Sequence, residues 1–288
     1  MKRYTIANLN ISVHGGEFGG FDRRMSGYAS SFDGQAADVQ IRCCDSDGIT
    51  LPDGKTLKRI HRWQWIETAG DGYAAFQTLP GSDTVVSLLE VDREWKNARL
   101  QLRGFENNLG ITNELRRYLT AGEIFSYAVL QHDGLILHAS AIDYDGGAIL
   151  FSAPSGTGKS THTSLWNTHY GGKTRVLNDD SPAIRFTDGK AYAFGTPWSG
   201  KTTLNLNRAA PLRAIVCLER GERNSIKRID AKTAAPLLLN ETRKPVYTEM
   251  MGLTLGVMQR LIAETPMYLL SCNVSKEAVD VVKTALGV

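Results

Sequence analysis

The segment "SAPSGTGKST", residues 152–161, places two glycines and a lysine between a strand-like run and a helix-like run. Gly156 and Gly158 allow the backbone to turn without a Cβ clash, so that consecutive N–H groups can face inward. A helix that begins near Lys159 adds the positive end of its dipole. The segment matches G-x-x-x-x-G-K-[ST], except that Ala153 replaces the first glycine. The spacing therefore predicts a strand–loop–helix unit that binds an anion.

The anion expected at this loop is the phosphate chain of ATP. In this motif Lys159 reaches the β and γ phosphates, and the hydroxyl of Ser160 is a ligand of Mg²⁺. The alternative is a glycine–serine turn that opens an ordinary helix, but the strand-like "AILFSA" before the loop favours the phosphate site. The residues predicted to bind the nucleotide are Ser155, Gly156, Thr157, Gly158, Lys159, Ser160 and Thr161.

Two adjacent acids end the next apolar run, "RVLNDDS", about twenty residues after the loop. Acids at the end of a neighbouring strand are typical of a magnesium site in proteins with such a loop. Two carboxylates this close resist ionising together, which suits one of them to act as a general base. Asp179 and Asp180 are both candidate metal ligands, and we favour Asp179 as the base. The alternative is an acidic turn before Pro182.

Two further residues are candidates for the chemistry. His138 lies in "LILHASAI", before the hairpin that leads into the loop, where a packed core histidine is the usual finding. Lys201 lies in "GTPWSGKTTLN", a second Gly-Lys-Thr segment without the strand–loop–helix frame. It is a candidate to neutralise charge on the transferred phosphate, and a solvated hairpin lysine is the alternative.

The pattern along the chain predicts two regions. Residues 1–110 contain short alternating runs separated by Gly-Asp turns, which predicts a β-rich region of antiparallel strands. Trp63 and Trp65 share a strand face with His61 there, and buried packing is the prediction for them. Residues 111–288 alternate strand-like and helix-like runs, with helices expected near 112–131, 161–171, 231–240, 248–264 and 275–286. The predicted fold class is mixed α/β with a β-rich N-terminal region.

The composition is that of an ordinary globular chain of 288 residues, with 42% hydrophobic and 22% charged residues. The net charge is +3 and no basic tract occurs, so we expect no nucleic-acid partner. No apolar run reaches the ~18 to 20 residues of a membrane-spanning helix, and the N-terminus lacks a signal-peptide pattern. The four cysteines form no C-x-x-C pair. We expect a soluble cytoplasmic protein with reduced thiols.

The histidine of "LHAS", the loop "SGTGKST" and the acids of "LNDD", in this order, resemble the catalytic domain of HPr kinase/phosphorylase. They resemble ATP-dependent phosphoenolpyruvate carboxykinase more distantly. The resemblance covers roughly residues 120–288 and implies a P-loop domain with a mixed sheet, which uses ATP and Mg²⁺. It also implies that His138 lies beside the phosphates and that the acid pair supplies metal binding and base catalysis.

The chain departs from that family at two places. HPr kinases carry an "RPGRN" segment where this chain reads "LLSCN", and a glycine-rich signature where this chain reads "GTPWSGKTTLN". Because both segments engage HPr, these differences argue against HPr itself as the acceptor. Similar proteins phosphorylate a serine of a ribosomal peptide precursor, and relatives form hexamers, so a homo-oligomer is one expectation.

These observations predict an ATP- and Mg²⁺-dependent kinase that transfers the γ-phosphoryl group to a hydroxyl. The expected acceptor is a serine of a peptide or protein, and residues 1–110 are candidates for its recognition. The predicted catalytic residues are His138, Lys159, Asp179, Asp180 and Lys201. Two alternatives remain open: a small-molecule kinase, and a nucleotide-binding regulatory module without transfer chemistry.

Overall fold

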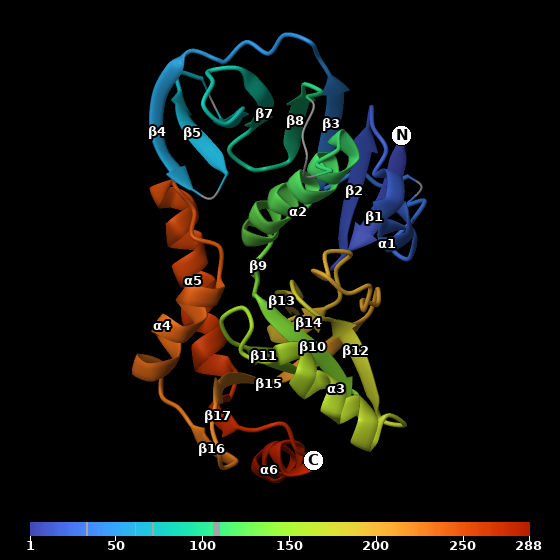
Figure 1. The fold of residues 1–288 in the computed structure, drawn as a ribbon, viewed down its shortest axis with the longest axis vertical. Coiled ribbons are helices and arrows are strands. Elements are labelled where there is room, and N and C mark those ends of the chain that lie inside the picture. Colours follow the sequence, from blue (N-terminus) through green and yellow to red (C-terminus); the bar gives the residue numbers. More distant parts are fainter. Residues whose placement is uncertain (33, 61, 71, 106–109) are drawn as a thin grey trace. The chain divides into compact units, whose positions relative to one another are not determined.

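The computed structural model describes residues 1–32, 34–60, 62–70, 72–105 and 110–288. The chain forms two compact units, each with its own sheet (Figure 1). One consists of Met1–Gln131 with Val246–Thr248, and the other of His132–Pro245 with Glu249–Val288. The helix of residues 113–131 therefore belongs to the first unit, beyond the boundary at 110 that the sequence pattern suggests. The fold is mixed α/β with a β-rich N-terminal region, as predicted.

The first unit has an eight-stranded sheet in the order β1-β2-β3-β8-β7-β6-β5-β4. Its β2–β3 and β3–β8 pairs are parallel, so the prediction of a purely antiparallel sheet is wrong. Strands that pair in parallel need long crossover connections, and the short Gly-Asp turns in the sequence did not indicate any. The elements are β1 (Lys2–Ile6), β2 (Leu9–His14), η1 (Gly19–Phe21), α1 (Asp22–Ser26), β3 (Val39–Asp45), β4 (Gly54–Ile60), β5 (Trp63–Thr68), β6 (Tyr73–Thr78), β7 (Val85–Val91), β8 (Asn97–Leu102) and α2 (Asn113–Gln131).

The long helix α2 packs on this sheet, with contacts to β3 and β8. The Nε1 of Trp63 donates to Glu123 Oε2 at 2.6 Å, and the ring of Trp65 meets Tyr127 edge to face. Both tryptophans are buried, as predicted, whereas His61 lies outside the described residues. The buried aromatic side chains therefore fix α2 on one face of the sheet.

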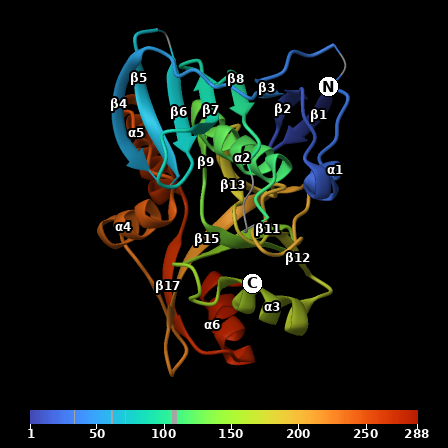
Figure 2. The same ribbon diagram turned by 45° about the horizontal axis from the view of Figure 1, so that its top comes forward.

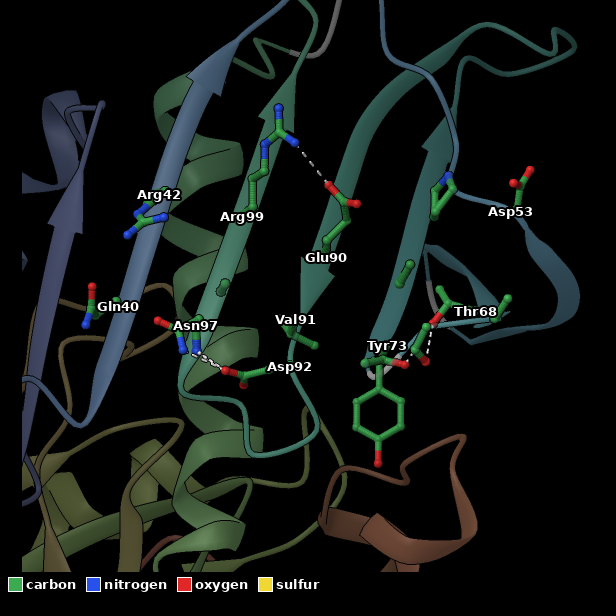
Figure 3. A pocket seen from close by; sticks show the side chains of 16 residues that line it. Gln40, Arg42, Asp53, Thr68, Tyr73, Glu90, Val91, Asp92, Asn97 and Arg99 are labelled. Atoms are coloured by element: carbon green, nitrogen blue, oxygen red, sulfur yellow. Dashed lines mark hydrogen bonds and ion pairs between the residues drawn. The ribbon is translucent and has the colours of Figure 1, made fainter.

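A cavity of about 570 Å³ lies in the first unit, with α2 behind the strands in this view (Figure 3). A row of charged side chains crosses three strands there: Arg42 and Arg99 are direct neighbours, and Arg99 Nη1 lies 3.8 Å from Glu90 Oε2. Asp53, from the connection before β4, lines the cavity too. The cavity thus carries charges of both signs at its lining. Acceptor recognition by this unit stays a prediction.

The second unit has a nine-stranded mixed sheet in the order β12-β10-β11-β15-β14-β13-β9, with β17 and β16 beyond the second half of β15. β11, β15 and β17 run parallel, whereas β10 pairs antiparallel with β11 and β12. The strands are β9 (Gly134–Ile136), β10 (Ala139–Tyr144), β11 (Gly147–Ser152), β12 (Thr174–Asn178), β13 (Ala183–Thr187), β14 (Lys190–Phe194), β15 (Ala209–Arg220), β16 (Ser225–Arg228) and β17 (Met267–Cys272).

The helices of this part of the chain are α3 (Lys159–Tyr170), α4 (Ala231–Glu241), α5 (Thr248–Glu264) and α6 (Lys276–Leu286), close to the predicted ranges. α3 and α6 contact each other, and both views show them side by side (Figures 1 and 2). Phe151 of β11, Trp166 of α3 and Val279 of α6 belong to one buried cluster. Because strand and helix share this core, the connection between β11 and α3 is anchored at both ends.

Sequence signals for hairpins and helix caps match the structure better than the signals for strand boundaries do. Asp188 and Gly189 both have positive φ in the tight turn between β13 and β14, as the Asp-Gly pair predicts. Ser275 caps α6 by accepting from Ala278 N. Residues 58–60 and 63–68 lie in two antiparallel strands, β4 and β5. In the described residues, no helix has both the length and the apolar character that crossing a membrane requires.

Candidate active site

The predicted phosphate loop connects β11 to α3. Gly156 and Gly158 have backbone φ values of +81° and +126°, which residues other than glycine rarely adopt. His162 N donates to Gly158 O at 2.9 Å and closes the first turn of α3. The N–H groups of residues 159–161 precede that bond and have no acceptor within the helix. The strand–loop–helix unit is therefore present, and its backbone donors suit a phosphate.

The ammonium group of Lys159 lies at the start of α3 and is turned back toward the sheet. Its Nζ donates to Ala153 O at 2.7 Å and lies 3.0 Å from His138 Nε2. The residue is only 7% exposed. Burial is the largest influence on the Lys159 pKa and lowers it, while nearby carboxylates, Glu241 first, act in the opposite direction. The Lys159 ammonium is thus held between Ala153 O and the ring of His138.

The two acids have different surroundings. Asp179 is buried, and its Oδ1 accepts from Ser140 Oγ at 2.7 Å. Ser140 Oγ also lies 3.0 Å from Thr163 Oγ1, which donates to the carbonyl of Ser160 at 3.0 Å. This chain of contacts ties Asp179 to the first turn of α3. Asp180 is more exposed, and its Oδ1 lies 3.8 Å from His138 Nε2.

A buried amide holds the acid pair in position. Asn178 Oδ1 accepts from the N–H groups of Asp180 and Ser181, and Asn178 Nδ2 donates to Thr196 O at 2.8 Å. The segment that contains the second Gly-Lys-Thr sequence is therefore fastened to the end of β12. A Cβ on Gly200 would lie 2.9 Å from the Asp180 side chain, so this segment approaches the acid closely. Lys201 follows Gly200 and is exposed.

Two residues of this site carry no local sequence signal. Arg220, the last residue of β15, donates from Nη2 to Gly156 O at 2.6 Å and from Nε to Thr157 O at 3.3 Å. Glu241, the last residue of α4, lies with Oε2 2.6 Å from His138 Nδ1. The parallel register of β11 with β15 brings Arg220 to the level of the loop. The pairing register of these two strands is the only signal that could have indicated the role of Arg220.

A cavity of about 390 Å³ lies beside the loop. Thr157 and Thr161 line it together with residues that follow β15 and β17. His162 lies behind them, where its Nε2 accepts from Trp166 Nε1 at 3.2 Å and burial lowers its pKa to about 4. His162 is therefore a packed side chain of this unit. The cavity therefore offers open space directly beside the loop.

The oxygen donors near the loop suit magnesium. The described residues contain no cluster of three or more His, Cys, Asp and Glu side chains placed to hold a metal ion. Mg²⁺ is usually bound by one or two carboxylates together with substrate phosphates and water, and needs no complete protein cage. Ser160, Asp179 and Asp180 supply hydroxyl and carboxylate oxygens of this kind. The residues present therefore fit Mg²⁺ together with a phosphate chain.

Comparisons with known proteins give a match to a protein family and a weak similarity to a solved structure. No curated protein matches the sequence. The HPr(Ser) kinase/phosphatase from Coxiella burnetii has a TM-score of 0.33 and 10% sequence identity to this chain, over 53% of this chain and 88% of its own. Similarity at this level carries no argument about fold or function. The model of "SynChlorMet cassette protein ScmC" matches residues 117–286, more than half of the chain. The chain belongs to the ScmC family.

Proposed function

We propose that this protein is an ATP- and Mg²⁺-dependent kinase that transfers the γ-phosphoryl group to a hydroxyl, with a serine of a peptide or protein as acceptor. The observation that carries the proposal is the link from Asp179 through Ser140 and Thr163 to the first turn of α3. Through it, the acid pair shares one site with the glycine loop and Lys159. A phosphate-binding turn alone does not require such an arrangement.

The loop and Lys159 bind and orient the phosphates in this proposal. The N–H groups at the start of α3 and the side chain of Arg220 contribute to the shape and charge of the loop. Ser160 and Asp180 would hold Mg²⁺, because Asp180 lies on the side of His138 and Lys159. When bound, Mg²⁺ would neutralise negative charge on the phosphate oxygens.

Asp179 is the proposed base that accepts the proton of the acceptor hydroxyl. The contact with Ser140 orients its carboxylate, and Asp179 therefore needs little rearrangement to serve as an acceptor. Lys201 is proposed to stabilise charge on the transferred group directly, and His138 is proposed to do so through its contact with Lys159. Positioning and electrostatic stabilisation make up most of the catalysis in phosphoryl transfer.

The test is incubation with γ-labelled ATP, Mg²⁺ and candidate peptides or a cell lysate, followed by mass analysis of the labelled product. Label on a serine of a polypeptide supports the proposal. Label that passes a size filter indicates a small-molecule kinase instead. Tight nucleotide binding without any labelled product indicates a regulatory module.

The roles of the two acids are tested by Asp179→Asn and Asp180→Asn. We expect Asp179→Asn to reduce transfer by about 100-fold or more while ATP binding stays near the wild-type affinity. Asp180→Asn should weaken the Mg²⁺-dependent part of ATP binding, measured by calorimetry with and without Mg²⁺. Equal loss of transfer and binding in Asp179→Asn would remove the base assignment.

A further inference from the structure

Glu241 is a carboxylate near the loop that the proposed transfer chemistry does not use. It is the last residue of α4, its side chain is 12% exposed, and its Oε2 lies 2.6 Å from His138 Nδ1. Its main-chain carbonyl accepts from His138 N at 2.9 Å. Glu241 therefore holds His138 by both backbone and side chain, from an element about a hundred residues away in sequence.

The two ring nitrogens of His138 face partners of opposite kind. An ionised carboxylate only accepts hydrogen bonds and an ammonium group only donates them. Neutral imidazole has one N–H and one lone pair, so the Glu241 contact assigns the proton to Nδ1. The lone pair of Nε2 then faces Lys159 Nζ at 3.0 Å. Asp180 Oδ1, at 3.8 Å from Nε2, lies beyond hydrogen-bond distance.

We propose that Glu241 is a positioning residue that fixes the Nδ1–H tautomer of His138, so that His138 Nε2 and Ala153 O hold the Lys159 ammonium at the loop before phosphates bind. This inference rests on the proposed function, because it gives Glu241 a role in preparing the same nucleotide site. Glu241 hydrogen-bonds His138 and not the loop, and its negative charge also acts directly on the Lys159 ammonium.

Loss of the Glu241 carboxylate changes the hydrogen-bonding partners of Lys159. Without Glu241 nothing requires the proton to stay on Nδ1, and the Nε2–H tautomer places an N–H donor against the ammonium donors of Lys159. The ammonium then loses one of its two acceptors and its fixed position. Partners that orient a metal-ligating histidine typically contribute about 10-fold or more in affinity, and we expect an effect of the same size here, so that ATP binding weakens by about 10-fold.

The experiment uses the full chain labelled with ¹⁵N-histidine, without nucleotide. Long-range ¹H–¹⁵N correlation spectra report which ring nitrogen of each histidine carries the proton, and His138→Gln assigns the signal. Glu241→Leu removes the acceptor, Glu241→Gln restores an acceptor oxygen without the charge, and Glu264→Leu is the control. Glu264 is likewise the last residue of a helix, but its carboxylate pairs with Arg260.

We expect the Nδ1–H pattern for His138 in the wild type and in Glu264→Leu, its loss in Glu241→Leu, and partial retention in Glu241→Gln. ATP affinity should follow the same order. An Nε2–H pattern in the wild type, or an unchanged Nδ1–H pattern in Glu241→Leu, would overturn the proposal. Because the spectra need no nucleotide, they decide the role of Glu241 even if the wild type binds no ATP. If Glu241→Leu does not fold, Glu241→Gln decides the role of Glu241. Partial loss of the Nδ1–H pattern supports the proposal, and an unchanged pattern overturns it.

Discussion

His162 makes the stability of the second unit depend on pH. The imidazole is 3% exposed, its ring packs against Phe151, and Trp166 Nε1 donates to its Nε2. Burial lowers the His162 pKa from 6.5 to about 4. The unfolded chain therefore binds a proton between pH 6.5 and pH 4 that the folded chain does not bind. Stability contributed by the neutral imidazole is present above pH 6.5 and is lost as the pH falls through this window.

The size of the effect follows from the shift in the His162 pKa. At roughly 1.4 kcal/mol per pKa unit, the whole shift corresponds to about 3 kcal/mol of unfolding free energy below pH 4. Between about pH 7.5 and about pH 5 the expected loss is about 2 kcal/mol. That loss is a large part of the stability of an ordinary domain.

The assay is urea unfolding of the full chain, followed by circular dichroism at both pH values. His162→Gln removes the titrating group and keeps a side chain that can accept from Trp166, so it should lose about 2 kcal/mol less than the wild type on acidification. His169→Gln, an exposed histidine of the same helix, should behave as the wild type does. Equal losses in the wild type and His162→Gln would refute the assignment of the pH dependence to His162.

Two further substitutions test the loop. Gly158→Ala should weaken ATP binding by about 5-fold or more, because the +126° φ costs a residue with a Cβ about 1–3 kcal/mol. Gly172→Ala, after the same helix, should have little effect. Arg220→Ala should weaken ATP binding about 3- to 10-fold, since the carbonyls of Gly156 and Thr157 lose a charged donor. The melting temperature of Arg220→Ala should stay close to the wild-type value, because this arginine is exposed. Calorimetry measures the ATP affinity, and thermal unfolding measures the melting temperature.

The parts of the site that the sequence predicted are those fixed by local chain geometry. The loop is recognisable because glycine spacing, the lysine and the flanking elements all lie within twenty residues. The acid pair is recognisable because an apolar strand ends directly before it. In both cases the residue types and the local backbone conformation depend on the same short stretch of chain.

The parts that the sequence missed depend on contacts between distant segments. Arg220 reaches the loop because β15 pairs parallel with β11, and Glu241 reaches His138 because α4 ends beside β9 and β10. A charged residue at the end of an element has no pattern that distinguishes such a role from a solvated surface. The parallel strands of the first unit were missed for a related reason, since pairing partners are not encoded in the alternation of one strand.

The buried side chain of Asn178 has a consequence for the chemical ageing of the protein. Deamidation would change the residue by a single group and leave its size nearly the same. The new carboxylate oxygen, however, would face the carbonyl of Thr196, where an N–H now donates. It would also add a third negative charge beside Asp179 and Asp180. Slow hydrolysis of one amide would therefore disorganise the acid pair without altering any residue of the loop.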